Sequence, residues 1–336
     1  MDDFINKWSD FVYNHPDGNI FQTPEMYEIY QKTVNYEPII VSIQNNKKNI
    51  IGILLAVIQK EGSGFIGKLS SRSVVWGGPL VKDNDPLILD KILQKYNKLV
   101  SSKVIFTQFR NINDLNHFKP IFKKNGFKFE NHLDIINNLE LSENKLWENL
   151  SRDRKKSIKL ALKSLTIKDI SNDKKMILET YKVIASIYDR IKLPIPHITF
   201  FYNIYDVLNK KNYFKTFAAY YNDKLIGVRI VLCYKDLIYD WYAGSDESYL
   251  KYRPNDILPW EIMKWGKQNG FKRFDFGGAG KPNKPYGVRE YKKKFGGEVV
   301  NYGRFIKIHN YFLYIIGIFG LKIYKIGYGL RKQKRV

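Results

Sequence analysis

Residues 271–299, FKRFDFGGAGKPNKPYGVREYKKKFGGEV, combine a carboxylate, two glycine pairs and many lysines in one short stretch. Asp275 ends a short apolar run and is followed, after one phenylalanine, by Gly277 and Gly278. A carboxylate in this position orients or deprotonates an amine, or it accepts backbone N–H bonds from the glycine turn. The glycines let the chain turn sharply and approach a ligand closely. The lysines at 292–294 favour a polyanionic substrate nearby.

The whole chain is strongly basic. Its 336 residues carry a formal net charge of +23, and from residue 251 onward twenty basic residues stand against five acidic ones. A positive field of this size attracts nucleic acid, phosphorylated small molecules or an anionic membrane face.

Other functional classes lack their expected signals. The single cysteine, Cys233, lies in the apolar run IVLCY and is interpreted as a core residue rather than a nucleophile. Without a second cysteine no disulfide is expected, and the acidic start MDDFINKW is not typical of a secretory signal, so a cytoplasmic location is predicted. The five histidines are scattered, and there is no P-loop or serine nucleophile elbow, so we expect no metal site.

A faint internal repeat predicts the elements that position the 271–299 stretch. YEPIIVSIQNNKKNIIGILLAVIQ, starting at Tyr36, and YFKTFAAYYNDKLIGVRIVLCY, starting at Tyr213, each have the pattern of a strand, a polar turn and a second strand. Each hairpin is followed by a strand, a helical stretch and a short strand, the last being VIFTQF or FKRFDF. The repeat predicts an α/β protein with mixed sheets built from two similar units. Chance similarity between two hairpins is the alternative.

We predict a first unit at residues 1–142, a second unit with the catalytic cleft at 143–308, and a tail at 309–336. The stretch 152–163 has the pattern of a helix with a basic face, which is either a solvated face or a binding surface. The uncharged run 311–321 of the tail is too short to span a bilayer. The tail therefore packs on the first unit or contacts an anionic membrane surface.

Four segments in this order resemble the Fem family of peptidyltransferases that build peptidoglycan cross-bridges. The resemblance spans nearly the whole chain and implies two tandem GNAT-type acyltransferase units. It implies transfer of an amino acid from aminoacyl-tRNA to an amine on the peptide of a lipid- or nucleotide-linked cell-wall precursor, with no cofactor. The segments are IFQTPEMYEIY, SRDRKKSIKLALKSL, YDWYAGSDESYLKYRPNDILPWEIMKWGKQNGFKRFDFGG and VREYKKKFGGEVV.

The resemblance also assigns roles to individual residues. Lys292 matches the family's lysine near the reacting ester, although the preceding aromatic is Tyr291 rather than phenylalanine. Arg190 in YDRIKLPIPH matches an arginine that grips the diphosphate of the precursor. The alternative for Lys292 is that it is one of three interchangeable surface lysines, and the alternative for Arg190 is a structural ion pair.

Lys292 and Asp275 are thus the catalytic candidates. Where the family has a phosphate-contacting lysine after FQTPE, this chain has Tyr30, with Lys32 close by. This departure from the family pattern leaves the identity of the acceptor, and the way it is held, undetermined. The predicted substrate-binding residues are Arg190, Tyr242, Arg253, Gly277, Gly278 and Lys32.

The main alternative is an N-acyltransferase that uses coenzyme A on an amino sugar or another cell-envelope precursor. Such enzymes bind the pyrophosphate with backbone N–H groups at a glycine-rich turn that opens a helix. The matching turn, AGSDESYLKYRPNDIL, offers only Gly244, and Pro254 has no N–H to donate. A third interpretation, a non-enzymatic nucleic-acid binder, explains the charge but not the repeat.

Overall fold

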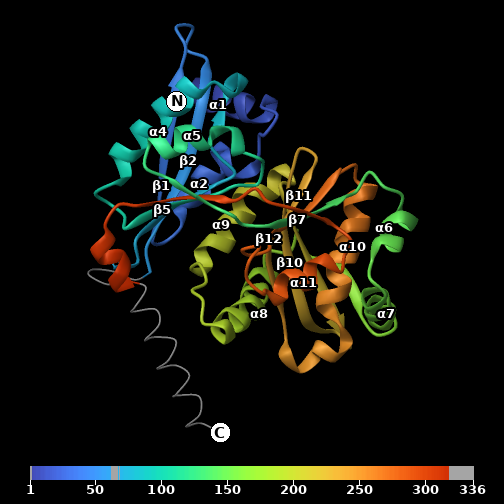
Figure 1. Cartoon of the computed structure of the whole chain (residues 1–336). Helices are drawn as coiled ribbons and strands as arrows, with labels where there is room; N and C mark the ends of the chain where they lie inside the picture. The colour runs from blue at the N-terminus through green and yellow to red at the C-terminus, as the bar shows by residue number, and fades with distance from the viewer. Residues whose placement is uncertain (1, 62–66, 68, 318–336) are drawn as a thin grey trace. The chain divides into compact units, whose positions relative to one another are not determined.

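The computed structural model describes residues 2–61, 67 and 69–317 (Figure 1). The chain divides into two compact units, one made of Met1–Glu130 with the described chain from Arg304 onward, the other of Asn131–Gly303. Within the described residues, each unit contains a seven-stranded mixed sheet. The predicted α/β class with mixed sheets is therefore confirmed.

The sheet of the first unit has the strand order β1-β2-β3-β5-β14-β6, with β4 paired to β2. The first predicted hairpin is β1–β2, in register from Tyr36↔Gln59 to Gln44↔Ile50. β3 and β5 pair in parallel. The elements are α1 (Asp2–Asn14), α2 (Pro24–Lys32), α4 (Pro86–Val100), α5 (Lys119–Lys124), β1 (Tyr36–Gln44), β2 (Ile50–Gln59), β3 (Arg72–Trp76), β4 (Leu80–Val81), β5 (Phe106–Arg110), β6 (Lys128–Glu130) and β14 (Arg304–Ile308).

The sheet of the second unit has the strand order β13-β7-β12-β11-β10-β9-β8. The second predicted hairpin is β9–β10, and β11 pairs in parallel with β12. Both units thus contain a hairpin, a third strand, a helix and a parallel fourth strand, as the repeat predicts. The elements are α6 (Glu143–Asn149), α7 (Arg152–Ala161), α8 (Met176–Ile191), α9 (Ile198–Leu208), α10 (Pro254–Gln268), α11 (Gly287–Lys293), β7 (Asp134–Asn138), β8 (Thr166–Asp169), β9 (Phe214–Tyr221), β10 (Lys224–Tyr234), β11 (Leu237–Ser245), β12 (Arg273–Gly278) and β13 (Glu298–Val300).

Each sheet takes one strand from outside the range that the sequence predicts for its unit. β7 lies before residue 142 but pairs with β12 and β13, and β14 lies within the range 143–308 but pairs with β5 and β6. The boundaries between the two units therefore fall after Glu130 and after Gly303. The buried ring of Phe305 in β14 stacks on Phe122 of α5, so the aromatic core of the first unit fixes this strand. Hairpin patterns do not reveal such distant pairing.

In the second unit α8 and α10 cover opposite faces of the sheet. A methyl group on Gly244 would lie 2.9 Å from the Ile184 backbone of α8, and one on Gly227 would lie 2.9 Å from Pro254 of α10. Gly244 pairs with Val228, the neighbour of Gly227 along β10, and neighbouring strand residues point to opposite faces. The two helices therefore enclose the sheet between them.

The predicted tail is described only as far as residue 317. Residues 311–317 are helical, and the ring of Tyr314 lies 5.5 Å from that of Phe106 in β5. The remainder, 318–336, lies outside the described residues. Among the described helices none is long and apolar enough to cross a bilayer.

Candidate active site

The second sheet opens where β11 and β12 diverge, a feature we call the splay. The two strands pair only from Leu237↔Arg273 to Tyr239↔Asp275. Beyond that point β11 continues beside β10 as far as Ser245, while β12 continues beside β7 as far as Gly278. The β10–β11 register shifts so that Trp241 is an extra residue, and such bulges bend strands next to active sites.

Lys292 of α11 binds the β12 side of the splay. Its ammonium donates to the carbonyl oxygens of Phe276 at 2.6 Å, Gly277 at 3.1 Å and Gly278 at 2.9 Å. An ammonium has three N–H donors, so these bonds use its full capacity. The two lysines that follow are exposed and pair with surface carboxylates. The three lysines of the KKK triplet are therefore not equivalent, because only Lys292 is turned toward the sheet.

The carboxylate of Asp275 lies beside this lysine. It is 1% exposed and accepts a hydrogen bond of 2.7 Å from the Gly277 N–H, which is the contact that a structural role requires. Burial raises the pKa of Asp275 to about 6, while the Gly277 N–H and the Lys292 ammonium oppose this rise. Gly277 has a φ of 67°, a conformation that favours glycine. A carboxyl group that titrates near neutral pH also suits a general base.

A buried ion pair lies on the β11 side of the splay. Arg229 of β10 and Asp240 of β11 approach to 3.4 Å, with side chains only 6% and 8% exposed. Burial raises the pKa of Asp240, and Arg229 and Lys292 oppose the change. Burial lowers the pKa of Lys292, and Asp240, Asp275 and Asp134 oppose that change. These groups therefore set each other's protonation.

Arg154 holds α11 against α7 and α10. Its guanidinium forms a buried ion pair with Asp256 of α10, donates to the Tyr291 carbonyl at 3.1 Å, and lies over the rings of Tyr291 and Phe295. Ser151 caps α7 by accepting from the Arg154 N–H at 3.2 Å. Because Tyr291 is fixed in this way, the next residue, Lys292, is aimed at β12.

The raised pKa of Asp275 predicts a pH-dependent stability. In the folded protein the carboxyl of Asp275 has a pKa of about 6, whereas its ordinary value is 3.8, so folding takes up a proton at pH values between these two. The stability from Asp275 is fully present below about pH 4 and is lost as the pH rises through about 6. We expect the unfolding free energies of wild type and Asp275→Asn to diverge across this window in denaturant titrations. A difference between these two unfolding free energies that stays constant from about pH 3.5 to about pH 7.5, a range that spans the change in the pKa of Asp275, would contradict the raised pKa.

Arg190 and Tyr242 gather at the far end of β11. Arg190 lies in the last turn of α8 and contacts Glu247 at 3.3 Å in an exposed pair, so the structure contains the ion pair named as its alternative role. Exposed pairs contribute little to stability, and the guanidinium can exchange Glu247 for another anion. The ring of Tyr242 lies 6.2 Å from that of Tyr188 and 5.2 Å from that of Phe201.

Several N–H groups of the connection between β11 and α10 are already bonded within the chain. The N–H groups of Tyr249, Arg253 and Asp256 bond to backbone carbonyls, and that of Ser248 bonds to the Asp246 carboxylate. Pro254 occupies the first position of α10 and has no N–H. Arg253 is exposed and left-handed, with a φ of 68°. Gly244, the one glycine of this turn, serves the close packing of α8.

Two residues singled out in the sequence lie away from the splay. Lys32 belongs to the first unit, where its ammonium pairs with Glu28 one helical turn earlier. Cys233 is buried in the second core, and burial raises the pKa of its thiol to about 12, as expected for a core residue. Within the described residues, no cluster of three histidine, cysteine or acidic side chains could hold a metal ion.

The sheet of the first unit does not open in the same way. β3 and β5 stay paired along five residues, from Arg72↔Phe106 to Trp76↔Arg110. The buried amide of Gln22, from the IFQTPE segment, donates to the carbonyls of Leu55 at 3.0 Å and Trp76 at 2.7 Å, and it accepts from the Leu55 N–H at 2.8 Å. This side chain closes the sheet between β2 and β3.

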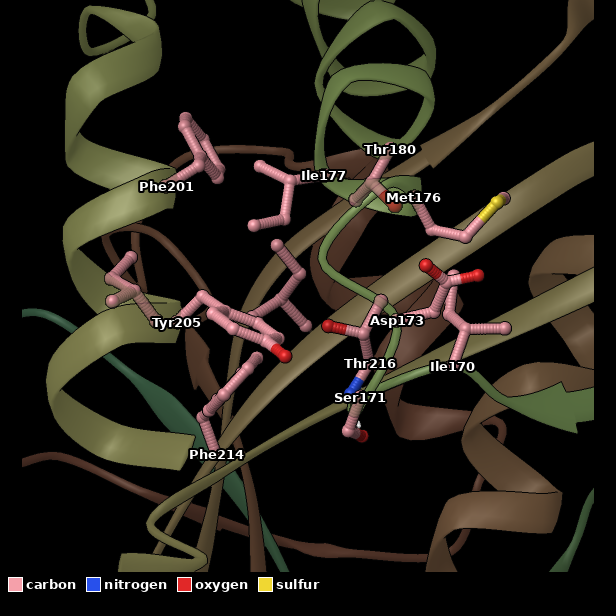
Figure 2. A pocket seen from close by; sticks show the side chains of 12 residues that line it. Ile170, Ser171, Asp173, Met176, Ile177, Thr180, Phe201, Tyr205, Phe214 and Thr216 are labelled. Atoms are coloured by element: carbon pink, nitrogen blue, oxygen red, sulfur yellow. Dashed lines mark hydrogen bonds between the residues drawn. The ribbon is translucent and has the colours of Figure 1, made fainter. Parts of the chain in front are cut away.

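A small cavity in the second unit is separate from these groups. Figure 2 shows it between α8, α9 and the sheet, with the side chains of Ile177, Phe201, Phe214 and others directed toward its centre. Its volume of about 20 Å³ is enough for about one water molecule. No residue of the splay lines it.

Comparison with protein families identifies the kind of enzyme. Residues 147–293 match the family model described as an acetyltransferase (GNAT) domain. This segment runs from α6 through α11 and contains every residue of the splay except those of β7. The chain is an acyltransferase with the GNAT fold. Comparison with curated proteins gives no significant match.

Solved structures that resemble this acyltransferase share its fold over nearly the whole chain. FemX aligns with a TM-score of 0.70 at 15% identity, over 93% of this chain and 98% of its own. A tandem GNAT protein from the clavulanic acid biosynthesis pathway aligns with a TM-score of 0.58 at 8% identity, over 92% and 96%. The C-terminal domain of a putative lysylphosphatidylglycerol synthetase from Agrobacterium fabrum aligns with a TM-score of 0.54 at 13% identity, over 92% of both chains. The tandem GNAT-like architecture predicted from the sequence is confirmed.

Sequence reasoning missed the buried charges of this acyltransferase. Arg229 interrupts the apolar run IGVRIVLC, and Asp240 interrupts LIYDWY. A charged residue inside an apolar strand is paired or functional, so this signal was available. Asp134 and Arg154 gave no such signal, because one follows a loop and the other lies among exposed basic residues.

Proposed function

We propose that this enzyme transfers an amino acid from aminoacyl-tRNA to the peptide amine of a lipid- or nucleotide-linked cell-wall precursor. The observation that carries the proposal is the β11–α10 connection. An enzyme of this fold that uses coenzyme A needs free N–H groups there to bind the pyrophosphate. Here those of Tyr249, Arg253 and Asp256 are engaged and Pro254 has none, which favours a donor held by other means.

The resemblances support the same donor. The Fem family, which the sequence resembles, takes amino acids from aminoacyl-tRNA, and FemX aligns over nearly the whole chain. A second neighbour is named for lysylphosphatidylglycerol, an aminoacylated lipid. An aminoacyl donor and an acceptor of the cell envelope account for both likenesses.

The splay supplies groups suited to aminoacyl transfer. The acceptor amine attacks the ester carbonyl, a C–N bond forms, and the ester C–O bond to the tRNA ribose breaks. Lys292 contributes a fixed positive charge where the carbonyl oxygen becomes negative. Asp275, whose pKa is about 6, takes the proton from the amine and returns it to the departing ribose oxygen.

Basic residues beside the splay suit the phosphate chain of the donor. Ser151 at the start of α7 donates its N–H to the Lys294 carbonyl at 3.0 Å, and the Lys294 ammonium lies 3.4 Å from Asp153. The start of α7 and the end of α11 therefore form one surface. Its exposed cations are Arg152, Lys156, Lys293 and Lys294. Phosphate contacts of this kind bind without sequence preference and weaken with salt.

Arg190→Ala tests the grip on the precursor. The lost contact is to a phosphate that is present in both ground and transition states, so we expect KM for the precursor to rise about tenfold with little change in kcat. Steady-state kinetics with varied precursor measure this split. Glu247→Ala removes the partner of Arg190 instead and should not raise KM. A fall in kcat at unchanged KM would place Arg190 among the reacting groups.

The proposed function itself is tested by mass spectrometry of the acceptor. Purified protein is incubated with pools of charged tRNA and candidate precursors. We expect one precursor to gain the mass of an aminoacyl residue, and uncharged tRNA to give no gain. Acylation of the precursor from acetyl-CoA, with none from charged tRNA, would instead assign a coenzyme A-dependent N-acyltransferase.

A further inference from the structure

Asp240 lies where the second sheet opens, on the face that α10 covers. β11 pairs with β12 only as far as Tyr239↔Asp275, so Asp240 is the first residue of β11 in the splay. On the other side it pairs with Val231 of β10, which belongs to the same core cluster as Ile257 of α10. Residues paired across an antiparallel ladder share one face of the sheet. The carboxylate therefore points to the side of α10, at the narrow end of the splay.

The two carboxylate oxygens of Asp240 are not equally satisfied. Oδ2 lies 3.4 Å from Nη1 of Arg229 in an ionic contact, whereas the buried Oδ1 has no hydrogen-bond partner within the described chain. The Asp240 side chain is only 8% exposed, so bulk water does not replace that partner. A buried acceptor without a donor destabilises a fold, and such an atom in a native protein calls for a ligand or an ordered water.

Lys292 does not supply the missing donor. Its three N–H groups are engaged by carbonyl oxygens of β12. Besides burial, the charges that shift the pKa of Lys292 are those of Asp134, Asp240, Asp275 and Arg229, so with Lys292 itself two cations face three carboxylates. The partner that Oδ1 lacks is an N–H donor, and this charge balance favours a cationic one.

The amino acid to be transferred carries such a cation. Its α-ammonium is attached to the carbon next to the ester carbonyl, and the proposed reaction places that carbonyl beside Lys292 and Asp275. An acetyl group has only a methyl at this position, which would leave Oδ1 unpaired. The surface proposed for the tRNA lies on the same side of the sheet, because Arg154 of α7 bonds to Asp256 of α10 and to Tyr291 of α11.

We propose that Asp240 binds the α-ammonium of the transferred amino acid and so restricts the enzyme to donors with a free amino group. The inference rests on the proposed function and names the part of the donor that the splay recognises. Arg229 is a positioning residue, since its charge holds the other carboxylate oxygen. A donor that is acylated on its nitrogen has no cation to offer and is rejected.

Two short RNAs that end in CCA test this recognition in the wild-type protein. One carries glycine and the other an acetyl group, each joined to the 3′ end through an amide so that nothing is transferred. The two RNAs differ only in the amino group, and glycine has no side chain that a pocket could exclude. We expect calorimetry to give a Kd for the glycyl RNA about tenfold or more below that for the acetyl RNA. Equal Kd values would overturn the role of Asp240.

A double variant assigns the preference to Asp240. Asp240→Asn alone would leave the buried charge of Arg229 without a partner, so it is combined with Arg229→Met. In the double variant we expect the two RNAs to bind equally, with the affinity for the acetyl RNA unchanged. Asp236→Asn is the control, because it makes the same change in an exposed ion pair with Arg273 and should retain the preference. A glycyl preference that persists in the double variant would mean that the ammonium binds elsewhere.

Failure of this inference and failure of the proposed function give different results. A wild-type protein that transfers amino acids from charged tRNA but binds both RNAs equally would overturn the recognition by Asp240 alone. A protein that binds neither RNA and transfers nothing from charged tRNA would overturn the proposed function, and the role of Asp240 with it.

Discussion

Replacement of Lys292 by methionine is expected to lower kcat for aminoacyl transfer about 100-fold or more. The change removes a fixed positive charge from the place where the ester oxygen becomes negative, and groups of this kind contribute two to three orders of magnitude. It also removes a cation that holds down the pKa of Asp275, so the acid limb of the pH–rate profile should move above its wild-type position near pH 6. Single-turnover rates across pH measure both effects.

Lys293→Met and Lys294→Met are the matched controls for this experiment. They make the same chemical change at neighbouring positions whose ammonium groups pair with surface carboxylates. At saturating charged tRNA we expect each to stay within about twofold of wild type in kcat, because the loss of one phosphate contact raises KM and leaves kcat unchanged. Equal and mild losses at all three positions would show that the triplet is only a charged face.

Replacement of Arg154 by methionine is expected to lower the free energy of unfolding of the second unit by about 3–5 kcal/mol. The change leaves Asp256 with an uncompensated charge in a largely buried position, and removal of one partner from a buried pair costs this much. The Tyr291 carbonyl also loses a donor. Denaturant unfolding followed by far-ultraviolet circular dichroism measures the loss.

Arg152→Met provides the control, because it lies on the same helix with an exposed side chain. We expect it to change stability by less than about 0.5 kcal/mol. Adding Asp256→Asn to Arg154→Met should recover part of the loss, since the unpaired charge is then gone. A loss in Arg154→Met no greater than in Arg152→Met would mean that Arg154 is another surface cation.

Part of the candidate site was predictable because it is local in sequence. Asp275, the two glycines and Lys292 lie within one strand–loop–helix segment, so any fold that closes this segment brings them close together. The two hairpins were also predictable, because alternation and polar turns are local signals. Lys292 could be distinguished from its two neighbours only when the direction of α11 was known.

The rest depends on contacts between distant parts of the chain. Arg154 has the same residue type and helical spacing as the exposed cations around it, and its partner Asp256 is more than a hundred residues further on. In the sequence, β7 and β14 each come after the hairpin, strand, helix and strand of one unit. Each of them nevertheless joins the sheet of the other unit, β7 that of the second and β14 that of the first. Neither a helical period nor a turn signal carries that information, because both describe only neighbouring residues.

One transfer assay distinguishes charged tRNA from acetyl-CoA as the donor. An isotope-labelled amino acid is supplied on tRNA, and label on the precursor is measured with and without RNase and at increasing salt. If charged tRNA is the donor, transfer vanishes with RNase and falls steeply between low and moderate salt, with a slope set by the number of phosphates neutralised. Transfer of the label that survives RNase, or acetylation of the precursor by acetyl-CoA at a rate indifferent to salt, would contradict charged tRNA as the donor.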